Sequence, residues 1–183
     1  MVICKKFDIG YRTFGVRDSK MMTERQREEV FKFLQAHPDV EWGIGKVGPA
    51  VIDKINILQA TRLAMVRAVK NLEKTLLAKP YDRKVSLGER VLLIDGNFGI
   101  KLPKSTSLVT QHSIIKGDSK VPIISMASII AKVTRDRMMQ NYHKKYPDYV
   151  FNQHKGYPTK QHYQTILAYG PCPIHRQSFR LKF

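Results

Sequence analysis

The chain has 183 residues, which is the length of one globular domain with its own core, and 43% of them are hydrophobic. Lysine and arginine number 32 against 15 aspartate and glutamate residues, so the formal net charge is +17. This composition excludes an intrinsically disordered chain, and the charge favours nucleic acid as a partner before an anionic membrane surface. We expect no secretory signal and no membrane-spanning segment, because no apolar run is long enough for either.

The cysteine content indicates a reduced, cytoplasmic protein without a zinc site. Cys4 and Cys172 lie near opposite ends of the chain and form no C-x-x-C pair. The alternative, a single disulfide between these two residues, is not required by anything else in the sequence.

Strand and helix patterns alternate in the first half of the chain. In chain order, the expected elements are a strand at residues 1–7, a loop at 8–15, a helix at 23–37, a strand at 40–47, a helical turn at 48–49 and a helix at 56–77. Thr23 and Gln26 form a capping box that begins the first helix, and His37-Pro38 ends it. Asn56 is a suitable N-cap for the second helix.

The second half continues the alternation, which predicts the α/β class and a single domain over residues 1–183. Its expected elements are strands at residues 90–94 and 108–115, helices at 123–142 and 159–169, loops at 80–89, 99–105 and 146–159, and a basic tail at 174–183. The continuous apolar run at 90–94 is typical of a strand buried on both faces.

Two acids follow two neighbouring strands of this pattern. Asp95 directly ends the apolar strand, and Asp118 lies between Gly117 and Ser119 after the next strand. Ligands in α/β folds bind at the carboxyl ends of strands, and paired carboxylates can share Mg²⁺ for phosphoryl chemistry. Taken alone, Asp95 has an equally good structural interpretation as the cap of an Asp-Gly turn.

The predicted helix at 123–142 adds weaker candidates. Ser125 and Ser128 lie on its first turns, either as buried serines or as phosphate contacts near the helix N-terminus. Lys132, Arg135 and Asp136 share one face, for which a solvated ion-pair face is favoured over a metal-ligand role for Asp136.

The predicted loop at 146–159 contains a candidate recognition site for RNA. Tyr157 lies between Gly156 and Pro158, where a tyrosine can stack on a sugar or base and hydrogen-bond a 2′-hydroxyl; the alternative is a packed loop aromatic. His154 and Lys155 precede it and suit phosphate contact or proton transfer. The other five histidines show no spacing typical of metal ligands.

These residues, in this order, resemble ribonuclease HII of the bacterial type over nearly the whole chain. The motifs that carry the resemblance are Asp18-Ser19-Lys20, Ile55-Asn56-Ile57-Leu58-x-Ala60-Thr61, Leu93-Ile94-Asp95-Gly96-Asn97, Lys116-Gly117-Asp118-Ser119, the run from Ala127 to Asp136, His154-Lys155-Gly156-Tyr157-Pro158-Thr159 and Arg176-x-Ser178-Phe179.

The resemblance implies a ribonuclease-H-like fold, a mixed sheet flanked by helices. It implies an endonuclease that cuts the RNA strand of RNA–DNA hybrids and incises 5′ to single ribonucleotides in duplex DNA, with Mg²⁺ or Mn²⁺. Asp95 and Asp118 match the third and fourth of the family's four metal-binding acids. Tyr157 matches the tyrosine that stacks on the ribose, and Lys20 matches a lysine near the substrate backbone. A cytoplasmic monomer that acts in DNA replication and ribonucleotide excision repair is expected.

One family motif has no counterpart in the sequence. The family's first strand ends in Asp-Glu-x-Gly-Arg-Gly, which supplies the other two acids and reads the 2′-hydroxyl. Residues 8–13 have only the Asp and the Arg at matching offsets and lie too close to Asp18, so we reject them. Residues 1–3 are interpreted as the family's second strand, and the first as missing, through either a start assigned at an internal methionine or a true loss.

Two expectations about activity follow. With two of four carboxylates, the chain is expected to bind hybrid duplex weakly and to cut it inefficiently. The alternative function is a non-catalytic basic nucleic-acid-binding domain. A Rossmann-type nucleotide enzyme is excluded, because no glycine-rich turn follows any expected strand.

Overall fold

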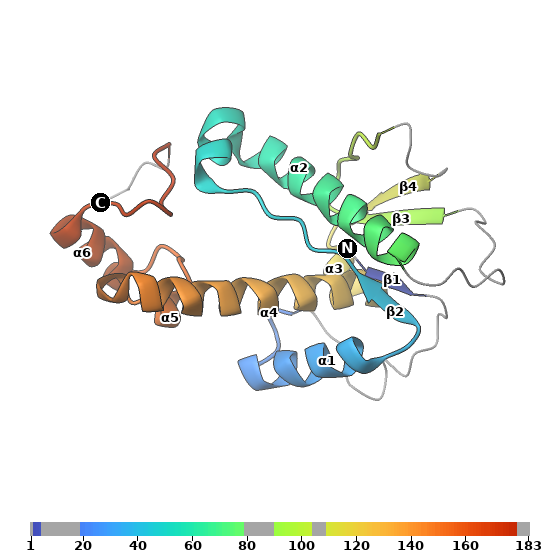
Figure 1. Ribbon diagram of the computed structural model, residues 1–183, viewed down its shortest axis with the longest axis horizontal. Helices are drawn as coiled ribbons and strands as arrows, with labels where there is room; N and C mark the ends of the chain where they lie inside the picture. Colours follow the sequence, from blue (N-terminus) through green and yellow to red (C-terminus); the bar gives the residue numbers. More distant parts are fainter. Residues whose placement is uncertain (1, 5–18, 79–89, 104–108, 179–183) are drawn as a thin grey trace.

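The computed structural model describes residues 2–4, 19–78, 90–103 and 109–178, and it has the expected α/β class (Figure 1). Its elements are β1 (Val2–Cys4), α1 (Glu24–Ala36), β2 (Val40–Trp42), α2 (Pro49–Ala78), β3 (Arg90–Asp95), β4 (Val109–Ile114), α3 (Gly117–Lys120), α4 (Pro122–Lys145), the 3-10 helix η1 (Pro147–Tyr149), α5 (Phe151–His154) and α6 (Lys160–Tyr169). The expected loops at 8–15 and 80–89 and the end of the basic tail lie outside the described residues.

The described strands form two two-stranded sheets. β1 pairs antiparallel with β2, and β3 pairs parallel with β4 from Arg90↔Val109 to Asp95↔Ile114. The N–H of Gly96 continues this ladder by donating to the carbonyl of Ile114 at 3.0 Å. Since the two strands are parallel, their carboxyl ends, with Asp95 and the turn before Asp118, meet at one edge of the sheet.

The long helix α4 runs through the middle of the molecule, and α1 packs against it (Figure 1). One buried cluster joins the two helices to β2; its members are Met22, Val30, Phe31, Leu34, Val40, Met126, Ile129, Ile130 and Val133. The expected capping box is present, because the Thr23 hydroxyl accepts from the N–H of Gln26 and the Gln26 side chain accepts from the N–H of Thr23. The expected helix at 123–142 is confirmed as α4.

The predicted strand at 40–47 ends at Trp42, because the chain then leaves the sheet and lies directly on α2. A Cβ built on Gly43 would be 2.2 Å from the carbonyl oxygen of Ala68, and one on Gly45 would be 1.8 Å from that of Ala64. These distances are far below van der Waals contact, so only glycine fits at either position. Residues 43–46 are called the glycine strap below.

Helix α2 contains the break that the sequence predicts. Asn56 has φ 66° and ψ 167°, and its Oδ1 accepts from the N–H of Gln59 at 3.1 Å. The short helical turn that begins at Pro49 and the long helix capped by Asn56 are therefore both present, across a kink.

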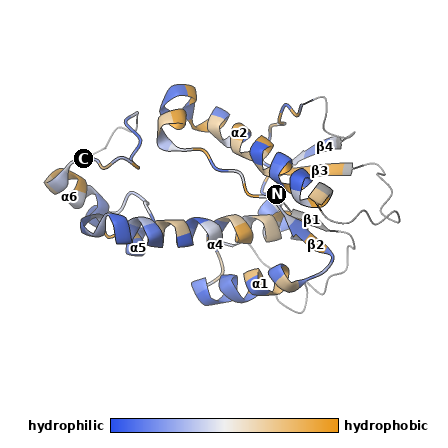
Figure 2. Cartoon of the chain, in the orientation of Figure 1, coloured by the Kyte–Doolittle hydropathy of each residue, from blue (hydrophilic) through white to orange (hydrophobic). Residues whose placement is uncertain are grey.

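The prediction that residues 90–94 are buried on both faces is wrong. Leu92 and Ile94 are buried against Val69 and Ile100, whereas the side chain of Val91 is 56% exposed. α2 covers one face of β3, and in the described part of the chain no comparable layer covers Val91. Figure 2 shows β3 as a hydrophobic strand beside the more polar β4.

The predicted loop at 146–159 contains two short helical segments, η1 and α5, so the structure corrects that prediction. Tyr149 and Phe151 stack at 5.4 Å between ring centroids and are buried with Met139 and Cys172. Val150, with φ 52°, separates η1 from α5, and Lys155, with φ 51°, ends α5. α6 begins at the predicted cap, since the hydroxyl of Thr159 accepts from the N–H of His162 at 3.2 Å.

The end of the described chain is fastened to the first turns of α2 (Figure 1). The carboxylate of Asp53 accepts from the N–H groups of Gln177 and Ser178 at 2.9 and 3.0 Å and from the Ser178 hydroxyl at 2.5 Å. These hydrogen bonds, with that of the Ser178 hydroxyl the strongest, lower the pKa of Asp53. Cys172 is a buried free cysteine. No helix in the described ranges has the length and apolar character needed to cross a bilayer.

Replacing Gly45 by alanine is expected to destabilise the fold, because the new methyl group meets the α2 backbone and not a movable side chain. The free energy of unfolding is expected to fall by about 1–3 kcal/mol or more, as measured by urea unfolding. Gly48→Ala is the matched control, since a Cβ there meets nothing within 4 Å. Equal stability of the two variants would contradict the close approach of the glycine strap.

Candidate active site

A hydrogen bond joins Asp95 to Gly117, the residue before Asp118. Asp95 ends β3, and its Oδ1 accepts from the backbone N–H of Gly117 at 2.8 Å. Asp118 is the next residue, the second of α3. The bond therefore fixes the turn that carries Asp118 against the end of the strand that carries Asp95.

The two carboxylates differ in environment. Asp118 is buried, with 7% of its surface exposed, whereas Asp95 is exposed. The ammonium of Lys20 lies 3.2 Å from Oδ2 of Asp118, and the Lys20 side chain is 79% exposed. An ion pair with one such exposed partner contributes little to stability, so Lys20 can change partners at small cost.

Ser128 holds the segment that carries Lys20. The hydroxyls of Ser128 on α4 and of buried Ser19 lie 2.9 Å apart. The structure therefore gives Ser128 a contact within the protein and places it next to the Lys20 segment. Ser125, the other candidate serine on α4, is buried.

Asp136 and Arg27 also hold the segment that carries Lys20. Asp136 is buried, with its Oδ1 2.7 Å from Nζ of Lys132 and its Oδ2 3.9 Å from Nη2 of Arg27. Arg27 in turn donates to the carbonyls of Ser19, at 3.0 Å, and Met22. The expected solvated ion-pair face is thus wrong for Asp136, whose carboxylate is buried and paired with two cations.

Tyr157 is exposed to solvent on the loop after α5. Its side chain is 55% exposed, and Nζ of Lys132 lies 5.3 Å from the centre of its ring. The same lysine binds Asp136, so Lys132 links the exposed ring to the α4 network. The tyrosine is not the packed loop aromatic that was its alternative interpretation.

His154 fixes the loop from within. Its ring is buried, with Nδ1 accepting from the N–H of Gly156 at 3.1 Å and Nε2 2.7 Å from the carbonyl of Tyr149. Because a carbonyl only accepts, Nε2 carries the proton and the ring is neutral. Burial lowers the pKa of His154, so its ring stays neutral to a lower pH than an exposed histidine does. Lys155 follows as a half-buried residue in the left-handed conformation.

Two further histidines, which sequence reasoning missed, also hold the loop that carries Tyr157. The N–H of Cys172 donates to Nδ1 of His175 at 2.9 Å, so Nε2 of His175 donates to Nε2 of His162 at 3.0 Å. Nδ1 of His162 then donates to the carbonyl of Tyr157 at 3.0 Å. The sequence positions 162 and 175 carry no spacing signal; only the tertiary fold brings them together.

The structure therefore makes two groups from the predicted residues. Asp95, Asp118, Lys20 and Ser128 belong to one connected set, and Tyr157, His154 and Lys155 belong to another that reaches the first through Lys132. No group of three or more histidine, cysteine or acidic side chains suited to a metal ion occurs among the described residues. Asp95 and Asp118 still fit Mg²⁺ or Mn²⁺ as hard oxygen ligands, because Mg²⁺ commonly uses one or two carboxylates together with substrate phosphates.

Comparison with known proteins gives a consistent result. The Ribonuclease HII family model matches residues 1–182. The chain is 45% identical to Ribonuclease HII of Polynucleobacter necessarius subsp. necessarius (strain STIR1) over 165 residues, which cover 90% of this chain and 76% of that protein. It is 42% identical to Ribonuclease HII of Shewanella sp. (strain MR-7) over 166 residues, covering 91% and 73%.

Two solved structures share the fold. The crystal structure of ribonuclease H2 from Pyrococcus horikoshii OT3 matches with a TM-score of 0.64 and 28% identity, over 92% of this chain and 78% of that chain. The structure of the PCNA:RNase HII complex from Archaeoglobus fulgidus matches with a TM-score of 0.67 and 24% identity, over 100% and 86%.

The histidine cluster predicts a loss of stability in acid. Burial is the largest cause that lowers the pKa of His154, His162 and His175 below the usual 6.5. Below pH 6.5 the unfolded chain therefore binds more protons than the folded chain, so the free energy of unfolding decreases as the pH falls. Urea unfolding at steps from about pH 7.5 to about pH 5.5 measures this slope.

Replacing His162 by phenylalanine removes one of these groups and is expected to flatten the pH dependence. His112→Gln, on the exposed side of β4, is the control and is expected to keep it. A stability that rises on acidification would contradict the burial of the three rings.

Proposed function

The chain belongs to the ribonuclease HII family, whose members are ribonucleases acting on RNA–DNA hybrids, and we propose that it hydrolyses the RNA strand of such hybrids and incises 5′ to single ribonucleotides in duplex DNA. The observation that carries the proposal is the hydrogen bond from Gly117 to Asp95, which brings Asp118 to the end of β3. The protein acts as a cytoplasmic monomer, in DNA replication and ribonucleotide excision repair.

Asp95 and Asp118 would hold the divalent cation, Mg²⁺ or Mn²⁺. The cation supplies charge that offsets the negative charge on the phosphate under attack. Asp95 keeps one oxygen for this role, since its Oδ1 is bound to Gly117. Asp118 offers a buried carboxylate, and burial strengthens its electrostatic interaction with a nearby cation.

Lys20 exchanges partners when substrate enters. In the structure its ammonium contacts Oδ2 of Asp118, and its exposed side chain reaches solvent. Because the ion pair with Asp118 contributes little, the exposed ammonium can leave it and bind a phosphate of the substrate backbone. Ser128 supports this step by holding Ser19, and it contacts the same backbone.

Tyr157 recognises the ribonucleotide. Its exposed ring stacks on the sugar at the junction, and its hydroxyl reaches the 2′-hydroxyl that distinguishes RNA from DNA. His154 contributes by positioning, because its neutral ring fixes the N–H of Gly156 and stacks on His162 at 4.2 Å. Lys155 contacts a phosphate beside it.

A second candidate function is a basic nucleic-acid-binding domain without catalysis. It is favoured by one observation, that Asp118 is paired with a lysine and belongs to no larger acidic group among the described residues. Cleavage measurements separate the two functions.

The 183-residue chain is expected to incise a duplex carrying one ribonucleotide slowly, with Mg²⁺ or Mn²⁺, because two carboxylates bind the cation weakly. Asp95→Asn and Asp118→Asn are each expected to lower the rate of incision at least about 100-fold, since the lost charge stabilisation amounts to several kcal/mol. Incision is measured on denaturing gels with the protein in excess over substrate.

Glu24→Gln, an exposed acid at the start of α1, is the control and is expected to keep the parent rate. Absence of incision by the parent chain would overturn the catalytic proposal in favour of the binding domain. Rapid incision would overturn the expectation of a weak cation site.

Tyr157→Ala is expected to weaken binding to the ribonucleotide-containing duplex by about 1–3 kcal/mol, the usual contribution of one stacked aromatic ring. Tyr157→Phe keeps the ring, so it is expected to bind like the parent chain but to discriminate less between a ribonucleotide and a deoxyribonucleotide. Fluorescence anisotropy without divalent cations measures both affinities. A Tyr157→Ala variant that binds both duplexes like the parent chain contradicts the role of the ring.

A further inference from the structure

A basic groove lies on the outer side of α2, between that helix and the glycine strap. It has a volume of about 530 Å³. Its lining consists of Ile44, Lys46, Arg67, Lys70, Asn71 and Lys74. Four of these six residues are cations and none is an acid, so the groove presents positive charge alone.

The walls of the groove are fixed by backbone contacts. The amide of Asn71 donates to the carbonyl of Ile44 at 2.7 Å, and Nη1 of Arg67 donates to the carbonyl of Lys46 at 2.5 Å. Gly43 and Gly45 allow the strap to lie against the helix backbone. The groove is thus built by the fold and does not depend on the rotamers of surface side chains alone.

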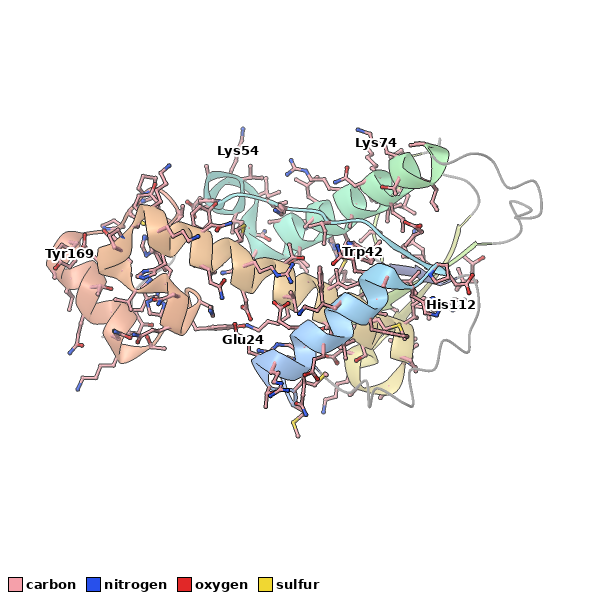
Figure 3. The ribbon with its side chains drawn as sticks, turned by 60° about the horizontal axis from the view of Figure 1, so that its bottom comes forward. Glu24, Trp42, Lys54, Lys74, His112 and Tyr169 are labelled. Atoms are coloured by element: carbon pink, nitrogen blue, oxygen red, sulfur yellow. The ribbon has the colours of Figure 1, made fainter. Side chains whose placement is uncertain are left out.

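The lysines of the groove carry exposed positive charge. Lys46, Lys70 and Lys74 are exposed, and Figure 3 shows the labelled Lys74 pointing outward from α2. None of the ion pairs among the described residues involves them. Lys70 and Lys74 are one helical turn apart, and like charges at this spacing repel each other. An anionic ligand would relieve this repulsion.

The spacing of the cations matches a phosphate backbone. Arg67, Lys70 and Lys74 lie on one face of α2 and span about 10.5 Å along its axis. One nucleic-acid strand rises about 3.4 Å per nucleotide, so this length faces about three phosphates. Lysines act as point charges and read no sequence, as contact with a backbone requires.

Helix α2 carries the groove on one side and contacts the segments next to Asp95 on another. The guanidinium of Arg62 on α2 lies 5.2 Å from the ring centre of Phe98, which is three residues after Asp95. Lys70 and Lys74 follow Arg62 by about 12 and 18 Å along the helix axis. Val69, the residue before Lys70, is buried in one cluster with Ile94, the residue before Asp95, so α2 connects the groove to the strand that ends in Asp95.

We propose that this groove binds the phosphate backbone of the substrate duplex on a flank of the cleavage site. The proposal rests on the proposed function only in placing the duplex at Asp95 and Asp118. In this proposal the glycine strap contributes to binding as well as to packing. The phosphates of the duplex neutralise the positive charges that line α2.

The test compares binding of the parent chain and of a Lys70→Ala/Lys74→Ala variant to a hybrid of about 20 base pairs, without divalent cations. Loss of two phosphate contacts is expected to reduce the slope of log affinity against log salt by about 1.8. The advantage of the parent chain then shrinks about twelvefold between 50 and 200 mM salt, as that slope implies. Fluorescence anisotropy measures both quantities.

Lys32→Ala/Lys144→Ala is the matched control, because it removes the same charge from exposed positions of α1 and α4. It is expected to retain the parent slope.

Parent-like affinity and slope of the groove variant would overturn the proposal, and so would an equal loss of slope in the control variant. Both outcomes are independent of catalysis, because no divalent cation is present. Failure of the chain to incise any duplex, with the groove difference retained, refutes the proposed function alone.

Discussion

Burial of one side of α4 is the constraint on which the rest of the structure depends. Ile129, Ile130 and Val133 pack against α1 and β2, and Met139 packs further along the same helix against Tyr149 and Phe151. Each such side chain contributes about 1.5–3 kcal/mol when it leaves water. The helix surface that stays polar carries Ser128, Lys132 and Asp136, so the packing of the buried side sets where these groups point.

Acids in this basic protein are held by cations or by directed hydrogen bonds. Buried Asp136 is placed between Lys132 and Arg27, and buried Asp118 contacts Lys20. Asp136 is buried together with its partners, and a buried carboxylate left unpaired costs about 3–5 kcal/mol, whereas the pair of Asp118 with the exposed Lys20 contributes little. The pairing of Asp136 with Arg27 also fixes the segment that carries Lys20, because Arg27 donates to the carbonyls of Ser19 and Met22 on either side of it. The lysine beside Asp118 is thus fixed at its backbone and movable at its tip.

Much of the fold could be predicted from local pattern because local chemistry decides it. The capping box at Thr23, the break at Asn56 and the cap at Thr159 each depend on residues within four positions of one another. Burial was harder. The apolar run at 90–94 does not say whether one or two layers cover a strand, and only the placement of α2 leaves Val91 exposed. The strand expected at 40–47 stops early because Gly43 and Gly45 approach a helix that is distant in sequence.

The sequence by itself determined the family resemblance, the acid at the end of β3, the acid in the next turn and the tyrosine loop, since each is a short motif whose residues are neighbours in the chain. Tertiary structure alone decided the rest. The Gly117 N–H reaches Asp95, Cys172 and His175 reach Tyr157 through His162, and the glycine strap forms a basic groove with α2. These contacts join segments far apart in sequence, and their geometry is set by which surfaces the core buries.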